Sequence, residues 1–256
     1  MSRNFELLHE AGKVQDMLSQ PVEMRKLIDE SPLPPPAPIL PSTPAIQTEG
    51  IARDEVMKLV QRLFLSGGQG HRQVVFAGTE AGNGCSWVCA RAADLLASQA
   101  AGSVCVVDCN MVSPTLHLEY HVENHHGLAD ALRTDESIRL YTQKLSRSNL
   151  WLLSAGSIDK NSEQQLTLEA MRRRLSELRA VFDYVLLDVA PLATADHAST
   201  LGKWCDGVAL VLKANASSRK GARKVLEGLK TAQIPVLGAV LNQRTFPIPE
   251  SIYNRL

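Results

Sequence analysis

Short apolar runs alternate with longer amphipathic stretches along the chain from about residue 50 onward. The runs are nearly continuous in apolar residues, which is typical of strands buried on both faces of a sheet. The stretches between them have the spacing of helices that cover such a sheet. The pattern therefore predicts an α/β fold with a doubly wound, mostly parallel sheet flanked by helices, over residues 50–243. The predicted strands are 73–77, 104–107, 150–153, 184–187, 208–212 and 236–241. The predicted helices are 55–65, 86–99, 126–133, 163–181, 194–203 and 217–232.

The two ends of the chain have a different pattern. Apolar residues recur at helical spacing between Phe5 and Leu18, which predicts a short helical segment within residues 1–30. Residues 31–49 are rich in proline, which lacks a backbone N–H and fixes φ, so this stretch is predicted to be an extended linker. Residues 244–256 are predicted to form a short C-terminal tail.

Composition and charge exclude several classes of protein. Lys plus Arg is 27 and Asp plus Glu is 27, so the chain lacks the net positive charge of a general nucleic-acid binder. It has no apolar run of roughly 18 residues that would form a membrane-spanning helix. Its N-terminus lacks the apolar stretch of a signal peptide. The 5 cysteines are an odd number in a chain of this size, which favours a reducing, cytoplasmic location.

A glycine-rich loop follows the first predicted strand. Residues 78–86 read Gly-Thr-Glu-Ala-Gly-Asn-Gly-Cys-Ser and lead directly into a predicted helix. The backbone N–H groups of such a loop and of the helix N-terminus bind phosphate groups, and the hydroxyl of Ser86 would bind Mg²⁺. The complete phosphate-binding motif has Lys before that Ser, whereas this chain has Cys85. A tight strand-to-helix turn without a ligand is the alternative.

Two acidic residues follow apolar strands. Asp108 comes directly after 104–107, and Asp188 comes directly after 184–187. A carboxylate at such a position is costly unless it meets water, a metal or a hydrogen-bond donor. Each acid alone could cap the next helix. Together with a phosphate-type loop on the first strand, they indicate a Mg²⁺-nucleotide site.

Several further sequence blocks occur in a fixed order along residues 53–242. These blocks are Glu55–Phe64, Thr79–Ser86, Val106–Asn110, Gly127–Leu132, Leu152–Gly156, Asp183–Pro191 and Leu237–Asn242. In this order they resemble the bacterial tyrosine kinases of capsule and exopolysaccharide systems. That family is part of the MinD/ParA-like branch of P-loop ATPases.

The resemblance implies ATP or ADP with Mg²⁺ as the cofactor. The implied cofactor-binding residues are Thr79, Gly82, Asn83, Gly84, Cys85, Ser86, Trp87 and Asn242, the last of them near the base. The implied catalytic residues are Asp108 and Asp188, and the implied Mg²⁺ ligands are Ser86, Asp108 and Asp188.

The chain departs from the family pattern at functional positions. Cys85 replaces the loop Lys, and Asn110 replaces the second acid of the motif that begins at Asp108. The family ends in a tyrosine cluster, whereas here Tyr253 is alone near the C-terminus. Losing a single charge-stabilising donor typically lowers a rate by roughly 10²- to 10³-fold. The departures therefore favour a degenerate, pseudokinase-like relative that binds nucleotide but transfers phosphate poorly or not at all.

The resemblance also implies partners. Such domains work with a membrane polysaccharide co-polymerase, whose cytosolic segment would hold this chain at the inner face of the membrane. The helix at 55–65 resembles the family's self-association helix, although Lys58 and Gln61 stand where the family has Arg. An active ATP-dependent tyrosine autokinase is the alternative function. A positioning ATPase of the MinD/ParA kind is a weaker one, because those proteins also need the loop Lys.

Three other groups of residues have possible roles. The histidines between His117 and His126 have a spacing that can bind Zn²⁺ on a helix, although a polar connection is the simpler interpretation. Cys85, at a helix N-terminus that lowers thiol pKa, could be a redox-sensitive thiol, but small buried apolar cysteines are the commoner explanation, particularly for Cys89 and Cys105. The basic stretches 171–179 and 219–230 are expected to form solvated helix faces.

Overall fold

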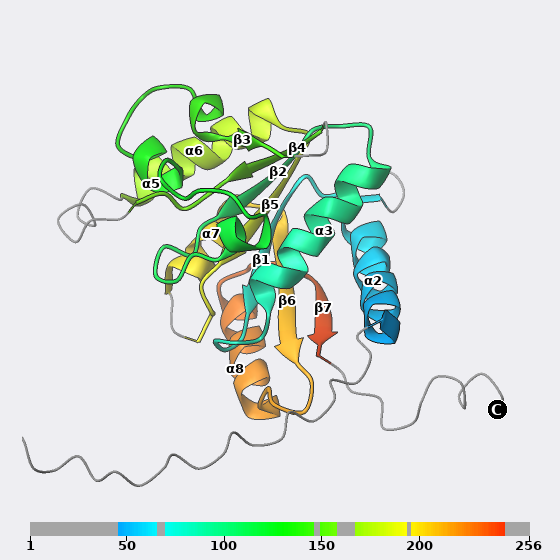
Figure 1. The fold of residues 1–256 in the computed structure, drawn as a ribbon. Helices are drawn as coiled ribbons and strands as arrows, with labels where there is room; N and C mark the ends of the chain where they lie inside the picture. The colour runs from blue at the N-terminus through cyan, green and yellow to red at the C-terminus, as the bar shows by residue number, and fades with distance from the viewer. Residues whose placement is uncertain (1–45, 66–69, 146–148, 158–166, 194–195, 244–256) are drawn as a thin grey trace, which may run out of the picture. The chain divides into compact units, whose positions relative to one another are not determined.

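The computed structural model describes residues 46–65, 70–145, 149–157, 167–193 and 196–243 (Figure 1). The predicted helix within residues 1–30, most of the predicted linker and the predicted tail lie outside the described residues. Among those that are described, no helix combines the length and the apolar character needed to cross a bilayer.

The described residues form a seven-stranded sheet in the order β3-β4-β2-β5-β1-β6-β7. All neighbouring strands are parallel except β3 and β4, which are antiparallel. The strands are β1 Gln73–Gly78, β2 Val104–Asp108, β3 Gln143–Lys144, β4 Leu150–Leu153, β5 Tyr184–Val189, β6 Gly207–Lys213 and β7 Val236–Asn242. The six predicted strands are confirmed. The sequence did not predict β3, because it is only 2 residues long.

Helices flank the sheet. They are α2 Ile46–Val60, its π-helical extension Gln61–Leu65, α3 Cys85–Gln99, α4 Leu116–Glu119, α5 Leu128–Ala131, the 3-10 turn Ile138–Tyr141, α6 Leu168–Val181, α7 Asp196–Trp204 and α8 Arg219–Thr231. Two predicted boundaries are wrong. Helix α2 begins at Ile46, inside the predicted linker 31–49 and well before residue 55. Helix α5 is shorter than the predicted 126–133.

The shortness of α5 has a physical cause at the end of β4. The backbone of Gly127 lies directly against the chain at Ser154, where a Cβ would overlap the Ser154 carbonyl oxygen. The N–H groups of Leu128 and Ala129 donate to the carbonyls of Ser154 and Ala155, at 2.8 and 2.9 Å. This stretch therefore continues the contacts of the sheet and begins a helix only at Leu128.

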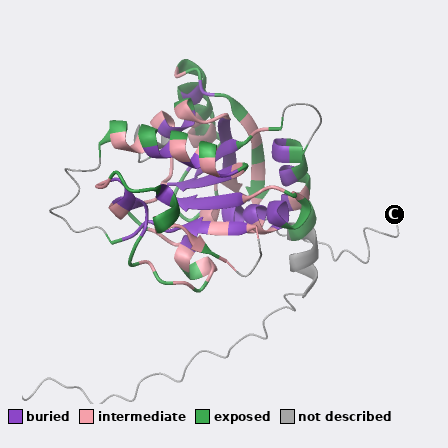
Figure 2. Ribbon diagram, turned by 90° about the horizontal axis from the view of Figure 1, so that it is seen from above, coloured by how far each residue is buried: buried purple, intermediate pink, exposed green. Residues whose placement is uncertain are grey.

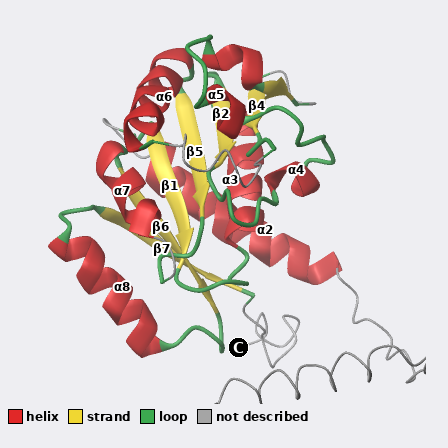
Figure 3. Cartoon of the chain, turned by 90° about the vertical axis from the view of Figure 1, so that its left-hand side faces the viewer, coloured by secondary structure: helices red, strands yellow, loops and turns green. Residues whose placement is uncertain are grey.

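Two apolar layers cover the sheet. Helices α2 and α3 pack on one face, and α6 and α7 pack on the other (Figure 3). Every residue of β1 and β2 is buried, as the continuous apolar runs predicted (Figure 2). The parallel strands end at the same edge of the sheet. The loop after β1 and the aspartates at the carboxyl ends of β2 and β5 therefore lie together at that edge. Asp108 and Asp188 are register partners in adjacent strands.

Candidate functional site

The loop between β1 and α3 is held by its own asparagine. Gly82 and Gly84 have φ angles of 79° and 74°, a left-handed conformation that favours glycine. Asn83, which lies between them, is buried. Its side-chain amide donates to the Thr79 hydroxyl at 2.9 Å and to the Val211 carbonyl at 3.1 Å. The loop is thus fastened both to itself and to the neighbouring strand β6.

Asn242, at the end of β7, also contacts this loop. Its amide donates to the carbonyl of Asn83 at 2.9 Å. The same amide lies directly over Gly84, where a Cβ would overlap it. Helix α3 begins at the next residue, Cys85, so its first-turn N–H groups lie beside this contact. The contact shown is therefore with the phosphate-type loop, and a place for Asn242 near a base stays a prediction.

Asp188 is a buried carboxylate without a well-formed hydrogen bond. Its exposed fraction is 0%, and neither carboxylate oxygen has a hydrogen-bond partner of standard geometry. The pKa of Asp188 is raised to about 7, mainly by burial and in part by the charge of Asp108, while looser interactions with the Ser86 hydroxyl and the Cys85 thiol oppose the rise. A charged form kept here needs a compensating positive group.

Asp108 is equally buried but fully engaged. Its carboxylate accepts hydrogen bonds from the backbone N–H groups of Asn110 at 3.1 Å and of Thr115 and Leu116 at 3.0 Å each. Burial raises its pKa, and these three donors oppose the rise. Asp108 therefore organises the loop that follows β2 and the start of α4, which is the structural alternative that the sequence offered for each acid.

The side chains of Ser86 and Asp188 suit a Mg²⁺ ion that also binds water and phosphate oxygens better than they suit a metal ion whose ligands all come from the protein. Mg²⁺ prefers oxygen ligands and usually binds through one or two carboxylates together with waters and phosphate oxygens. Neither oxygen of Asp188 has a hydrogen-bond partner of standard geometry, and the Ser86 hydroxyl interacts with the carboxylate more loosely. In the part of the chain that the structure describes, no group of three or more His, Cys, Asp and Glu residues is arranged to hold a metal ion.

The cysteine of the loop is a neutral thiol. Burial raises the pKa of Cys85 well above its usual value, and the negative charge of Asp188 and the neighbouring Cys89 raise it further. These effects act against the lowering of the thiol pKa that the redox-sensitive alternative needs, and they favour the apolar interpretation of Cys85. Cys89 is fully buried, which confirms its predicted apolar role. Trp87 is partly buried and packs on the apolar layer of α2 and α3.

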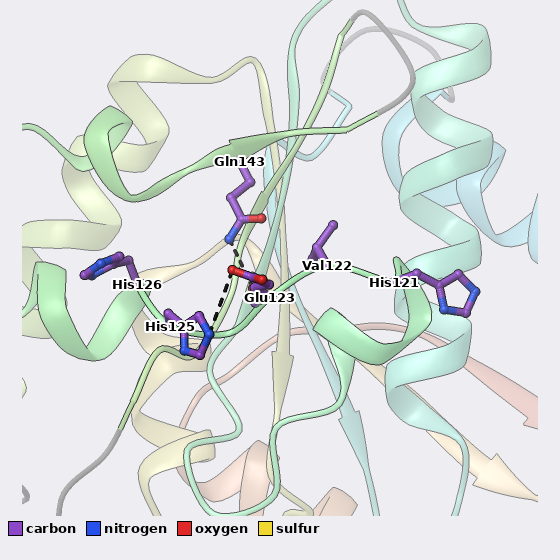
Figure 4. A pocket seen from close by; sticks show the side chains of 6 residues that line it. All are labelled: His121, Val122, Glu123, His125, His126 and Gln143. Atoms are coloured by element: carbon purple, nitrogen blue, oxygen red, sulfur yellow. Dashed lines mark hydrogen bonds and ion pairs between the residues drawn. The ribbon is translucent and has the colours of Figure 1, made fainter.

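The histidine-rich connection does not form a helical metal site. Helix α4 ends at Glu119, and His121 has a φ of 54°. Histidines instead line an open pocket of about 540 Å³ (Figure 4). The lining residues are His121, Val122, Glu123, His125, His126 and Gln143. The imidazole of His125 lies 3.8 Å from the Glu123 carboxylate, and the Gln143 amide donates to the Glu123 carbonyl. The polar-connection interpretation fits this geometry better than the Zn²⁺ interpretation.

The sequence missed the backbone groups that complete the site. The Val211 carbonyl holds Asn83, and the N–H groups of Thr115 and Leu116 hold Asp108. Every residue carries such groups, so residue types gave no signal for them.

Comparison with known proteins gives the lineage. Residues 71–227 match the family described as cellulose biosynthesis protein BcsQ. The chain is 30% identical over 161 residues to tyrosine-protein kinase YwqD of Bacillus subtilis, covering 63% of this chain and 68% of that protein.

Solved structures give the fold. The VpsO kinase domain superposes with a TM-score of 0.71 at 20% identity, covering 78% of this chain and 98% of that one. MinD of Pyrococcus horikoshii, solved with Mg-ADP, superposes with a TM-score of 0.59 at 21% identity, covering 72% and 76%. The fold is that of the MinD/ParA-like P-loop proteins. The chain belongs to the cellulose biosynthesis protein BcsQ family and is a homologue of the bacterial tyrosine kinases.

Proposed function

We propose that this protein binds a Mg²⁺-nucleotide at the loop 79–86 and acts as a nucleotide-dependent regulator whose phosphoryl transfer is weak or absent. The main support for Mg²⁺-nucleotide binding is Asp188, which lies beside the first turn of α3. Its carboxylate is fully buried and has no well-formed hydrogen bond. A protein keeps such a group at a cost in stability, which a bound cation would offset. The homologous kinases and the Mg-ADP complex of MinD also support a nucleotide.

The residues present fit this ligand. The N–H groups of the loop at Gly82–Cys85 and the helix dipole of α3 would bind phosphate oxygens. Ser86 and Asp188 would hold Mg²⁺, which neutralises charge on the phosphate chain. Asp108 would act mainly as a positioning residue, because three backbone N–H groups already occupy its carboxylate.

The proposed impairment rests on two uncharged side chains. Cys85, with its raised thiol pKa, supplies no positive charge where phosphoryl transfer needs one. Asn110 supplies no negative charge, and its side-chain oxygen accepts a hydrogen bond from the Ser113 N–H at 3.2 Å. It is therefore engaged in a local turn and is a poor base.

The proposed setting is the synthesis of a capsular or exported polysaccharide. We propose that the protein binds the cytosolic segment of a membrane co-polymerase and lies at the inner face of the membrane through it. Self-association through the helix 55–65 is part of the same proposal. On this helix, Glu55 and Lys58 are exposed and pair with each other at 2.8 Å. That ion pair would have to exchange for contacts with a second copy.

The 30% identity to YwqD favours a second candidate, an active tyrosine autokinase. One experiment separates the two functions. Mg-ATP binding is measured by calorimetry on the wild type and on Asp188→Asn, with a phosphotyrosine blot of the same samples. The proposal expects binding in the wild type, at least tenfold weaker binding in Asp188→Asn, and no phosphotyrosine.

Four other outcomes would change or refine the conclusion. Phosphotyrosine in the wild type that is lost in Asp188→Asn would establish the autokinase. The absence of any nucleotide binding would overturn both functions. ATP-dependent dimers without phosphotyrosine would point instead to a positioning ATPase. A gain of phosphotyrosine in Cys85→Lys would place the impairment at that one residue.

A further inference from the structure

The charges around the phosphate-type loop are unbalanced. Between Thr79 and Ser86 the only charged side chain is Glu80. Beneath the loop lie the buried carboxylates of Asp108 and Asp188. A phosphate chain carries several negative charges, and proteins that bind one supply Lys or Arg as well as backbone N–H groups. A cation from another element of the fold would therefore strengthen binding beyond what Mg²⁺ and the backbone N–H groups supply.

Strand β6 ends beside this loop with a lysine. Its last residue is Lys213, and β6 pairs in parallel with β1 so that Val211 is opposite Gly78. Lys213 therefore extends past the point where the loop begins. The Val211 carbonyl already binds the Asn83 side chain, which shows how closely the two segments approach. The end of β6 and the first turn of α3 lie at the same edge of the sheet (Figure 1).

The pleat of the strand places Lys213 on the side of the sheet that carries the loop. Side chains alternate between the faces of a strand. Ala209 and Val211 belong to the apolar layer of α2 and α3, and Lys213 continues their alternation. Its register partner on β7 is Asn242, whose amide reaches the loop at Asn83.

The lysine has a fixed backbone and a free ammonium group. The Lys213 N–H donates to the Ser217 hydroxyl at 2.8 Å, and its carbonyl accepts from the Ser217 N–H at 2.9 Å. The residue is half-buried. Among the described residues its ammonium makes no hydrogen bond or ion pair. A half-buried cation without a partner, close to a site for an anion, is available to bind that anion.

The geometry points to Lys213 as the residue that supplies positive charge to the phosphate chain of the bound nucleotide, in place of the lysine absent at Cys85. This inference rests on the proposed nucleotide binding and deepens it. The first turn of α8 also carries cations, at Arg219 and Lys220, but both are exposed to solvent. Glu80 lies beside that turn, because a Cβ on Gly221 would meet the Glu80 carboxylate at 3.1 Å. The negative charge of Glu80 would offset part of the positive charge of Arg219 and Lys220.

The test compares two lysine variants by calorimetry with Mg-ATP and with Mg-tripolyphosphate, which has no base or sugar. Lys213→Met is expected to weaken the binding of both ligands by roughly tenfold to a hundredfold, the usual effect of losing a charge-assisted hydrogen bond. Lys213→Arg is expected to keep most of the affinity. The matched control is Lys230→Met, which removes the same charge. Lys230 is an exposed lysine in the last turn of α8. The control variant is expected to leave both affinities unchanged.

A double variant separates charge from local structure. Cys85→Lys in the Lys213→Met background places a cation on a different element, and it is expected to restore tripolyphosphate binding. If the wild type binds both ligands and Lys213→Met weakens binding no more than Lys230→Met does, Lys213 does not have this role. The proposed function would then still stand. A loss of ATP affinity without a loss for tripolyphosphate would also overturn the role of Lys213. If the wild type binds neither ligand, the proposed function falls, and the role of Lys213 falls with it.

Discussion

The ends of β2 and β5 look alike in sequence and differ in chemistry. Each is an apolar strand with an aspartate at or next to its last residue, and the two aspartates are register partners that are both 0% exposed. Asp108 nevertheless accepts three backbone hydrogen bonds, whereas the oxygens of Asp188 accept none of standard geometry. An acid at a strand end is thus not one kind of group. The segment that follows it decides whether the acid is structural or available to a ligand.

The following segments differ because their N–H groups point to different partners. After β2 the chain turns back, and the N–H groups of residues 110, 115 and 116 reach Asp108. After β5 come Ala190 and then Pro191, which has no N–H. The next two N–H groups, of Leu192 and Ala193, donate to the carbonyls of Gly78 and Thr79 at 3.0 and 3.3 Å. The chain after β5 therefore supports the phosphate-type loop and leaves Asp188 without a backbone hydrogen-bond donor.

The largest effect is expected for Asp188→Asn, whose free energy of unfolding is compared with that of the wild type in the presence of a chelator and without nucleotide. Because the pKa of Asp188 rises from 3.8 to about 7 on folding, ionising it in the folded state costs up to about 4 kcal/mol. The variant removes that cost, so its free energy of unfolding is expected to exceed the wild-type value by up to that amount at about pH 8.

The pH dependence of this effect follows from proton counting. Between about pH 4 and pH 7 the folded state keeps a proton on Asp188 that the unfolded state has lost, so wild-type stability falls as pH rises through this window and levels off above it. The gain of Asp188→Asn is therefore expected to be near zero at about pH 4 and largest above pH 7. Urea titrations at several pH values measure it. If the gain in the free energy of unfolding does not change with pH, the raised pKa of the buried Asp188 carboxylate is contradicted.

The opposite sign is expected at the other acid. Asp108→Ala leaves three backbone N–H groups without their acceptor, which typically costs about 3 kcal/mol in the free energy of unfolding. Asp108→Asn keeps one side-chain oxygen and is expected to lose less. Urea unfolding at one pH compares these variants with Asp188→Ala. If both alanine variants destabilise the protein equally, the distinction between the two acids is wrong.

The loop that lies beside Asp188 offers a matched glycine pair. Gly82 and Gly84 both have left-handed φ angles, but a Cβ on Gly82 meets nothing within 4 Å, whereas on Gly84 it overlaps the Asn242 amide. Gly82→Ala is expected to cost about 1 kcal/mol from backbone strain alone. Gly84→Ala is expected to cost about 2 kcal/mol, because Asn242 must also move. Thermal unfolding ranks the two variants, and equal losses would show that the Asn242 contact adds nothing.

The smallest effect is expected at Asn242 itself. Asn242→Ala removes one hydrogen bond to the loop, worth about 1 kcal/mol, and is expected to weaken phosphate binding a few-fold. If Asn242 acts on the loop, Mg-ATP and Mg-tripolyphosphate lose affinity by the same factor. If it contacts the base, only Mg-ATP is affected. Calorimetry with the two ligands separates these roles.

Much of the fold was predictable because its strands are buried on both faces. Their continuous apolar runs placed all six longer strands, and the glycine-rich loop and Asp188 placed the core of the candidate site. Errors arose where distant contacts prevailed over local pattern. Arg174 lies in a basic stretch expected to be solvated, yet it is 2% exposed. Its guanidinium donates to the carbonyls of Ala131, Thr134 and Glu136, between 2.7 and 2.8 Å.

The sequence by itself determined the order of strands and helices, the loop at 79–86, the two acids and the neutral Cys85. These follow from the periodicity of apolar residues and from residue types at fixed spacing. The folded structure was needed to show that Asp108 accepts three backbone hydrogen bonds and Asp188 none of standard geometry, and that the strand ends with Lys213 and Asn242 lie beside the loop. Those facts depend on the register of strands far apart in the sequence and on the direction of backbone N–H groups, which residue types do not encode.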